Sequence, residues 1–239
     1  ILFFFGFSSF YISLTVLPLG TATALFFVTP FLITIFAHFF LKEEIGLRRW
    51  SAVVVGFIGV YVTLNPDFSN FNYLSLLPIL CAFCYSLSMI IIKKTSDKDS
   101  VYTQTFTFYI GAMILSVIFY FIIGDGQYNT SDHPASQFIF REWFGGFSNN
   151  ILLMVATGVT ATIAFLFLFT AYSIASPSVI SPFEYSILFW SPLVGWLYFD
   201  EIPSLNTVIG ILIIVSSGVY IFMREKAQNQ SIASEKPLR

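Results

Sequence analysis

Long apolar stretches separated by polar connections run through the whole chain. Eight of them are nearly free of charge, and they cover residues 1–17, 21–41, 50–64, 73–92, 101–123, 151–172, 179–198 and 207–222. A helix needs roughly 20 predominantly apolar residues to cross a bilayer, whereas a strand of a membrane barrel alternates apolar with polar positions. The pattern therefore predicts an all-α polytopic membrane protein with eight visible transmembrane helices.

The connections between these stretches are short, with one exception at residues 124–150. That stretch carries Asp, His, Arg and Glu side chains, so we expect a solvated surface loop instead of a separate domain. Residues 224–239 are polar and follow the last apolar stretch. They are predicted to form a tail.

Composition narrows the possible partners. Hydrophobic residues make up 56% of the chain and charged residues 10%, with a mean hydropathy of +0.81, whereas a soluble domain carries about 25% charged residues. The net charge of −2 removes the electrostatic case for a nucleic-acid partner. Two Cys without a Cys/His cluster give no basis for a metal site or a cofactor. The expected partners are the lipid bilayer and a small-molecule substrate.

The basic residues predict an orientation. With eight spans, ten of the eleven Lys and Arg residues fall on one side of the membrane, and Arg141 is the exception. Because loops rich in Lys and Arg stay in the cytoplasm, this side is expected to be cytoplasmic and to hold the C-terminus. We expect a multi-pass protein of a bacterial inner (plasma) membrane.

An internal repeat of opposite orientation connects the two halves. The stretch Leu41-Lys42-Glu43-Glu44-Ile45 recurs as Phe199-Asp200-Glu201-Ile202, and each following span ends in Gly-Val-Tyr. The predicted topology places the two copies on opposite sides, and inverted repeats are typical of secondary transporters. Residues 1–65 would hold three helices of the first repeat and residues 72–223 five of the second. We therefore expect the chain to begin within a longer protein, after two further helices.

Several soft motifs carry a resemblance to a known family. They are Thr29-Pro30, Gly56-Phe57-Ile58-Gly59-Val60, Ser181-Pro182-Phe183-Glu184-Tyr185 and Asp200-Glu201-Ile202-Pro203. In these the chain resembles the EamA-type members of the drug/metabolite transporter superfamily. The resemblance implies ten helices in two five-helix inverted repeats (5+5), a central cavity, and secondary transport of small metabolites, commonly amino acids or related compounds. The chain departs from the family by lacking the first two helices, one of which would be expected to line the cavity.

Glu184 is the one formally charged residue inside a predicted span. An ionisable group in hydrocarbon costs at least ~2.5 kcal/mol, so it usually faces a cavity or a partner. We hypothesise that Glu184 takes up a proton or pairs with a cationic group of the substrate. The alternative is an acid in the headgroup zone, favoured there by the dipole of a helix N-terminus.

The remaining candidates for substrate contact are uncharged. Aromatic rings next to Glu184 could hold a cation over a ring face, a proline at mid-span frees a backbone carbonyl, and small hydroxyls could bind a ligand. Lipid-facing rings, kinked packing and helix contacts explain such residues equally well. The candidates are Tyr185, Trp190, Thr29, Pro30, Tyr85, Ser86 and Ser9.

Together these features favour a secondary-active transporter of small polar metabolites that works by alternating access. No phosphate-binding loop of the ATPase type is present, and Glu184 makes the proton the expected coupling ion. The alternatives are an intramembrane enzyme or a receptor. An enzyme would need a second catalytic group at membrane depth, and His38 is the one histidine near a span. Glu44 and Glu201, which precede helices, are interpreted as structural acids at helix N-termini.

Overall fold

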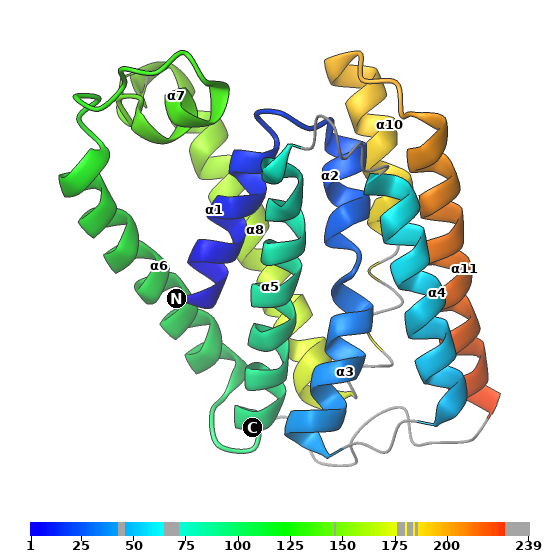
Figure 1. Ribbon diagram of the computed structural model, residues 1–239. Coiled ribbons are helices and arrows are strands. Elements are labelled where there is room, and N and C mark those ends of the chain that lie inside the picture. Colours follow the sequence, from blue (N-terminus) through cyan, green and yellow to red (C-terminus); the bar gives the residue numbers. More distant parts are fainter. Residues whose placement is uncertain are drawn as a thin grey trace.

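The computed structural model is a bundle of apolar helices (Figure 1) and describes residues 1–42, 46–64, 72–145, 147–175, 180, 184 and 186–227. Every regular element in these ranges is helical, which confirms the all-α fold class. The elements are α1 (Leu2–Ser13), α2 (Leu19–Phe26), α3 (Thr29–Leu41), α4 (Leu47–Leu64), the 3-10 turn η1 (Tyr73–Leu76), α5 (Leu77–Thr95), α6 (Val101–Ile123), α7 (Pro134–Phe140), α8 (Phe147–Ile174), α10 (Ile187–Phe199) and α11 (Leu205–Ala227).

The helices follow the predicted spans. Four segments are long and apolar enough to cross a membrane, namely Leu19–Leu41, Tyr73–Thr95, Val101–Ile123 and Asn150–Ile174. Shorter apolar helices fall on the other four predicted spans. Several boundaries differ from expectation: α1 ends at Ser13, the loop at residues 124–150 contains α7 and the start of α8, and α11 extends to Ala227, into the predicted tail. Residues 228–239 of that tail lie outside the described ranges.

The predicted span at residues 21–41 is two helices joined at Phe27 and Val28. Pro30 has no N–H, so the carbonyl of Phe26 cannot receive the usual backbone hydrogen bond from residue 30. The hydroxyl of Thr29 donates to that carbonyl instead, at 2.5 Å. The pair Thr29-Pro30 therefore both breaks the helix and satisfies one of the carbonyls that the break frees.

The two halves of the chain share an unusual turn. Lys42 ends α3 with φ 58° and Asp200 ends α10 with φ 55°, and among the described residues these are the two non-glycine residues with positive φ. In each case the backbone N–H bonds to the carbonyl five residues earlier, of Ala37 and of Gly195. The same left-handed cap thus occurs at both of the positions that the sequence comparison aligned.

The helices α4 and α11 pack side by side (Figure 1). Their backbones approach closely where Gly59 faces Gly210, because a Cβ atom on Gly210 would lie 2.7 Å from the Gly59 carbonyl oxygen. Thr63 Oγ1 donates to that same oxygen at 3.0 Å within α4, whereas Ser217 Oγ of α11 donates across the contact to the Ala52 carbonyl of α4 at 2.5 Å. Small residues and interhelical hydrogen bonds of this kind hold helices together in lipid.

Two long helices turn most of their surface outward. In the apolar windows of α6 and α8 none of the residues is buried, and Phe121 and Leu152 are 80% and 78% exposed. An apolar surface of this extent is rare on a soluble monomer but is what lipid tails cover. The chain is therefore an integral membrane protein.

Candidate functional site

Glu184 lies at the centre of a hydrogen-bonded group. Its Oε1 accepts a hydrogen bond from the hydroxyl of Tyr85 at 3.0 Å and another from the hydroxyl of Tyr172 at 2.8 Å. Tyr85 projects from the middle of α5 and Tyr172 from the last turn of α8, while Glu184 precedes α10. Three separate segments thus meet at one carboxylate oxygen. Both phenols are buried, and Glu184 is half-buried.

Phenylalanine rings surround the two phenols. The ring centroid of Tyr85 lies 5.4 Å from that of Phe26 and 5.8 Å from that of Phe3, and both contacts are edge-on. The ring centroid of Phe3 lies 5.9 Å from that of Phe169 on α8. Tyr85 and Tyr172 belong to the same apolar cluster as Phe3 and Phe169. A carboxylate in such surroundings attracts a cation more strongly than it would in water, because few water dipoles screen the two charges.

Ser86, the residue after Tyr85 on α5, contacts the break between α2 and α3. Ser86 Oγ is 2.7 Å from the carbonyl oxygen of Ala82 and 3.2 Å from that of Thr29, so its hydroxyl can serve either. Thr34 Oγ1 donates to the carbonyl of Pro30 at 2.9 Å. The structure therefore brings Tyr85, Ser86 and the Thr29-Pro30 break into one neighbourhood.

Three other candidates from the sequence lie elsewhere or outside the described ranges. Ser9 is buried on α1, and its Oγ donates to the Gly6 carbonyl at 2.7 Å. Trp190 is 57% exposed and meets the ring of Phe189 edge-on at 5.2 Å, so it faces the surroundings of the bundle. Tyr185 is outside the described residues.

Tyr172 is the member of the site that sequence reasoning missed. It is one of 12 tyrosines, and no charge or motif beside it marks it. The one available signal was its place at the end of an apolar span shortly before Glu184. A chain that leaves one helix and re-enters the bundle can bring those two positions together.

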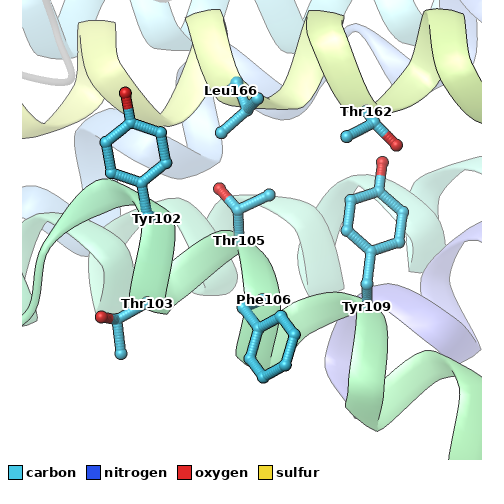
Figure 2. Close-up of a pocket in the computed structure, with 7 residues that line it drawn as sticks. All are labelled: Tyr102, Thr103, Thr105, Phe106, Tyr109, Thr162 and Leu166. Atoms are coloured by element: carbon cyan, nitrogen blue, oxygen red, sulfur yellow. The ribbon is translucent and has the colours of Figure 1, made fainter.

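Two hollows lie apart from Glu184. One, of about 630 Å³, lies among α1, α5, α6 and α7 and includes Ser9 and Arg141 in its wall. The other, of about 520 Å³, is a groove between α6 and α8. Figure 2 shows Tyr102 and Tyr109 of α6 pointing toward α8, where Thr162 faces Tyr109. Neither hollow has Glu184, Tyr85 or Tyr172 in its lining.

Known proteins are similar to this chain in sequence or in fold. The chain is 32% identical to an S-adenosylmethionine uptake transporter of Rickettsia conorii over 98% of this chain and 74% of that protein. It is 30% identical to a riboflavin transporter of Vibrio cholerae, over 89% of this chain and 65% of that protein. It is 23% identical to a pseudopaline exporter of Pseudomonas aeruginosa, over 88% of this chain and 68% of that protein. A solved crystal structure matches the fold with a TM-score of 0.59 at 14% identity, covering 95% of this chain and 75% of the other.

The named relatives are transporters, and they support membrane transport of small metabolites. The sequence pattern of the EamA-like transporter family matches residues 1–65 and 73–223, which is nearly the whole chain. The resemblance seen in the sequence is thereby confirmed, and the chain belongs to the EamA-like transporter family.

Proposed function

We propose that this protein is a secondary-active transporter that moves a small cationic metabolite, of the S-adenosylmethionine class, by alternating access of its two inverted repeats. The observation that carries the proposal is the Glu184 carboxylate with its Oε1 held by Tyr85 and Tyr172. With Oε1 oriented by two phenols, Oε2 is the oxygen that would meet a positive group of the substrate.

The aromatic surroundings support a substrate with both a charge and a ring. S-adenosylmethionine carries a sulfonium and an ammonium group next to an adenine ring. A positive group beside Tyr85 and Phe26 would gain from the ring faces as well as from the carboxylate. The relatives named for uptake of this compound are also 28–32% identical to the chain, which supports the same class.

Proton coupling follows from the same carboxylate. A proton and a cationic group compete for Glu184, since the protonated acid has no charge left to offer. We propose that protonation of Glu184 and binding of the substrate alternate during the transport cycle. Small polar metabolites such as amino acids remain the broader class, and their ammonium group is the part that Glu184 would contact.

The test is uptake by the purified protein in proteoliposomes. Radiolabelled S-adenosylmethionine, an amino acid and riboflavin are compared, with and without an imposed pH gradient. The proposal expects saturable uptake of S-adenosylmethionine that changes with the gradient, and little uptake of uncharged riboflavin. Uptake of riboflavin without S-adenosylmethionine would overturn the cationic class, and uptake of none of the three would overturn the proposed function.

A further inference from the structure

A short hydrogen bond joins the two repeats at the end of the bundle that carries α7, the start of α2 and the end of α10 (Figure 1, top). We call this the α7 end. Glu201 Oε2 accepts a hydrogen bond from the backbone N–H of Leu19 at 2.6 Å. Leu19 opens α2, and the preceding Pro18 provides no side-chain cap. A carboxylate at a helix N-terminus is favoured by both the free N–H groups and the helix dipole.

Glu201 binds the N-terminus of a different helix from the one that the sequence suggested. It was expected to act as a structural acid at a helix N-terminus, and its place just before α11 suggested that helix. The N–H that it binds instead belongs to α2, in the other repeat. The left-handed Asp200 turns the chain so that the N–H of Glu201 bonds to the Gly195 carbonyl at 3.1 Å.

Glycine at position 195 leaves room for this arrangement. A Cβ atom there would lie 3.2 Å from Glu201 Oε2, which is tighter than an ordinary contact. A Cβ atom on Gly20 would meet the ring of Pro192 at 3.4 Å. The helices α2 and α10 therefore lie close together near the Glu201 carboxylate, at Gly195 and at Gly20.

A second polar contact joins the repeats nearby. Thr21 Oγ1 and Thr207 Oγ1 are 3.2 Å apart, and Ser204 holds the start of α11 by accepting from the N–H of Thr207 at 3.2 Å. Among the described residues, these two hydrogen bonds at the α7 end both cross from one repeat to the other. A cap within one repeat would move with that repeat, whereas these bonds stretch when the repeats separate.

A buried serine on α10 can show whether α2 and α10 separate. Leu188, Ser191 and Gly195 recur every three or four residues on α10 and are buried. Ser191 Oγ has no hydrogen-bond partner among the residues that the structure describes. Because α10 packs on α2 at this end, separating the two helices would bring Ser191 into contact with water.

We propose that Glu201 is a latch, whose hydrogen bond to Leu19 holds the α7 end closed and breaks when that end opens. This proposal rests on the alternating access of the proposed function, and it extends that function by naming the contact that sets the conformational equilibrium. Removing the carboxylate shifts the protein toward the state in which the α7 end is open. Replacing Glu201 with Gln keeps a carbonyl oxygen for the Leu19 N–H and weakens the latch less.

The experiment follows modification of a single cysteine. Cys81 and Cys84 are replaced by Ser, Ser191→Cys is added, and the rate of reaction with a membrane-impermeant maleimide is measured in proteoliposomes from each side. Glu201→Ala is expected to raise the rate about tenfold from the side of the α7 end, since a hydrogen bond to a charged group is lost. Glu201→Gln gives a smaller rise. Glu142→Ala, which removes another acid at the same end, leaves the rate unchanged.

An unchanged rate in Glu201→Ala overturns the latch. A second reporter separates opening from unfolding: in the background with Ser191 retained, native Cys81 is 1% exposed on α5 and should stay unreactive. If Cys81 reacts as readily as Ser191→Cys, the carboxylate only stabilises the fold and the latch is refuted. Should Glu201→Ala not fold, Glu201→Gln is measured in its place, and a rate equal to that of the parent refutes the latch.

The labelling needs no substrate, so its result is independent of what the protein carries. A protein that fails to take up any tested metabolite but shows the Glu201-dependent rates would refute the proposed function and leave the latch in place. Uptake of S-adenosylmethionine, together with labelling rates that do not depend on Glu201, would support the proposed function and refute the latch.

Discussion

The contact between α4 and α11 makes a quantitative prediction for Gly210→Ala. The added Cβ atom would lie 2.7 Å from the carbonyl oxygen of Gly59 and would overlap Thr63 Oγ1. The threonine hydroxyl can rotate away, but the backbone oxygen cannot, so the two helices must move apart. Val60 and Ile214, which are 5% and 0% exposed, lie beside this contact and would lose packing.

Inserting a methyl group into a packed core typically costs about 1–3 kcal/mol, and the backbone clash places this variant toward the upper end of that range. For a chain of this size, 1 kcal/mol shifts the melting temperature by about 2–4 °C. We therefore expect Gly210→Ala to melt several degrees below the parent protein. The measurement is thermal unfolding in detergent micelles, followed by the fluorescence of the four tryptophans.

The chain offers matched controls for this variant. Gly111 and Gly158 lie on the outward helices α6 and α8, and a Cβ atom at either position meets nothing within 4 Å. Alanine there gains about 0.5–1 kcal/mol of helix stability, so these variants should melt at or above the parent. If Gly210→Ala melts no lower than Gly158→Ala, the close approach of α4 and α11 does not exist as described.

Three further predictions concern the site. Tyr172→Phe removes one of the two donors to Glu184, and initial rates of uptake should fall about tenfold, as for the loss of one hydrogen bond to a charged group; an unchanged rate would exclude Tyr172 from the site. Thr29→Val leaves the Phe26 carbonyl without its hydroxyl donor and should destabilise the protein by about 1–3 kcal/mol in thermal unfolding, with Thr29→Ser as the control that restores it. Trp190→Ala should transport at the rate of the parent, because the ring is exposed, and a large loss would show that it contacts substrate.

The spans and the helix break could be predicted because each depends on local chemistry. Apolar length identified the spans, and a proline without an N–H marked the break beside Thr29. The intramembrane acid was also evident, since Glu184 is so costly in hydrocarbon. These features need no knowledge of which helices are neighbours.

The directions of side chains could not be predicted in the same way. The helix α10 is apolar on every face, so no periodicity distinguishes Trp190, which faces outward, from Ser191, which is buried. Glu201 pairs with Leu19, which lies 182 residues earlier in the chain, and Tyr172 pairs with Glu184 across the connection between two helices. Only the packing of the helices brings such groups together.

The central claim is that Glu184 binds the positive group of the substrate. Its most direct test is uptake by the parent protein and by Glu184→Gln of S-adenosylmethionine and of S-adenosylhomocysteine, the thioether that lacks the sulfonium charge. The account predicts that the parent prefers S-adenosylmethionine and that Glu184→Gln loses this preference, while both proteins insert and melt alike. An unchanged preference in Glu184→Gln would contradict it.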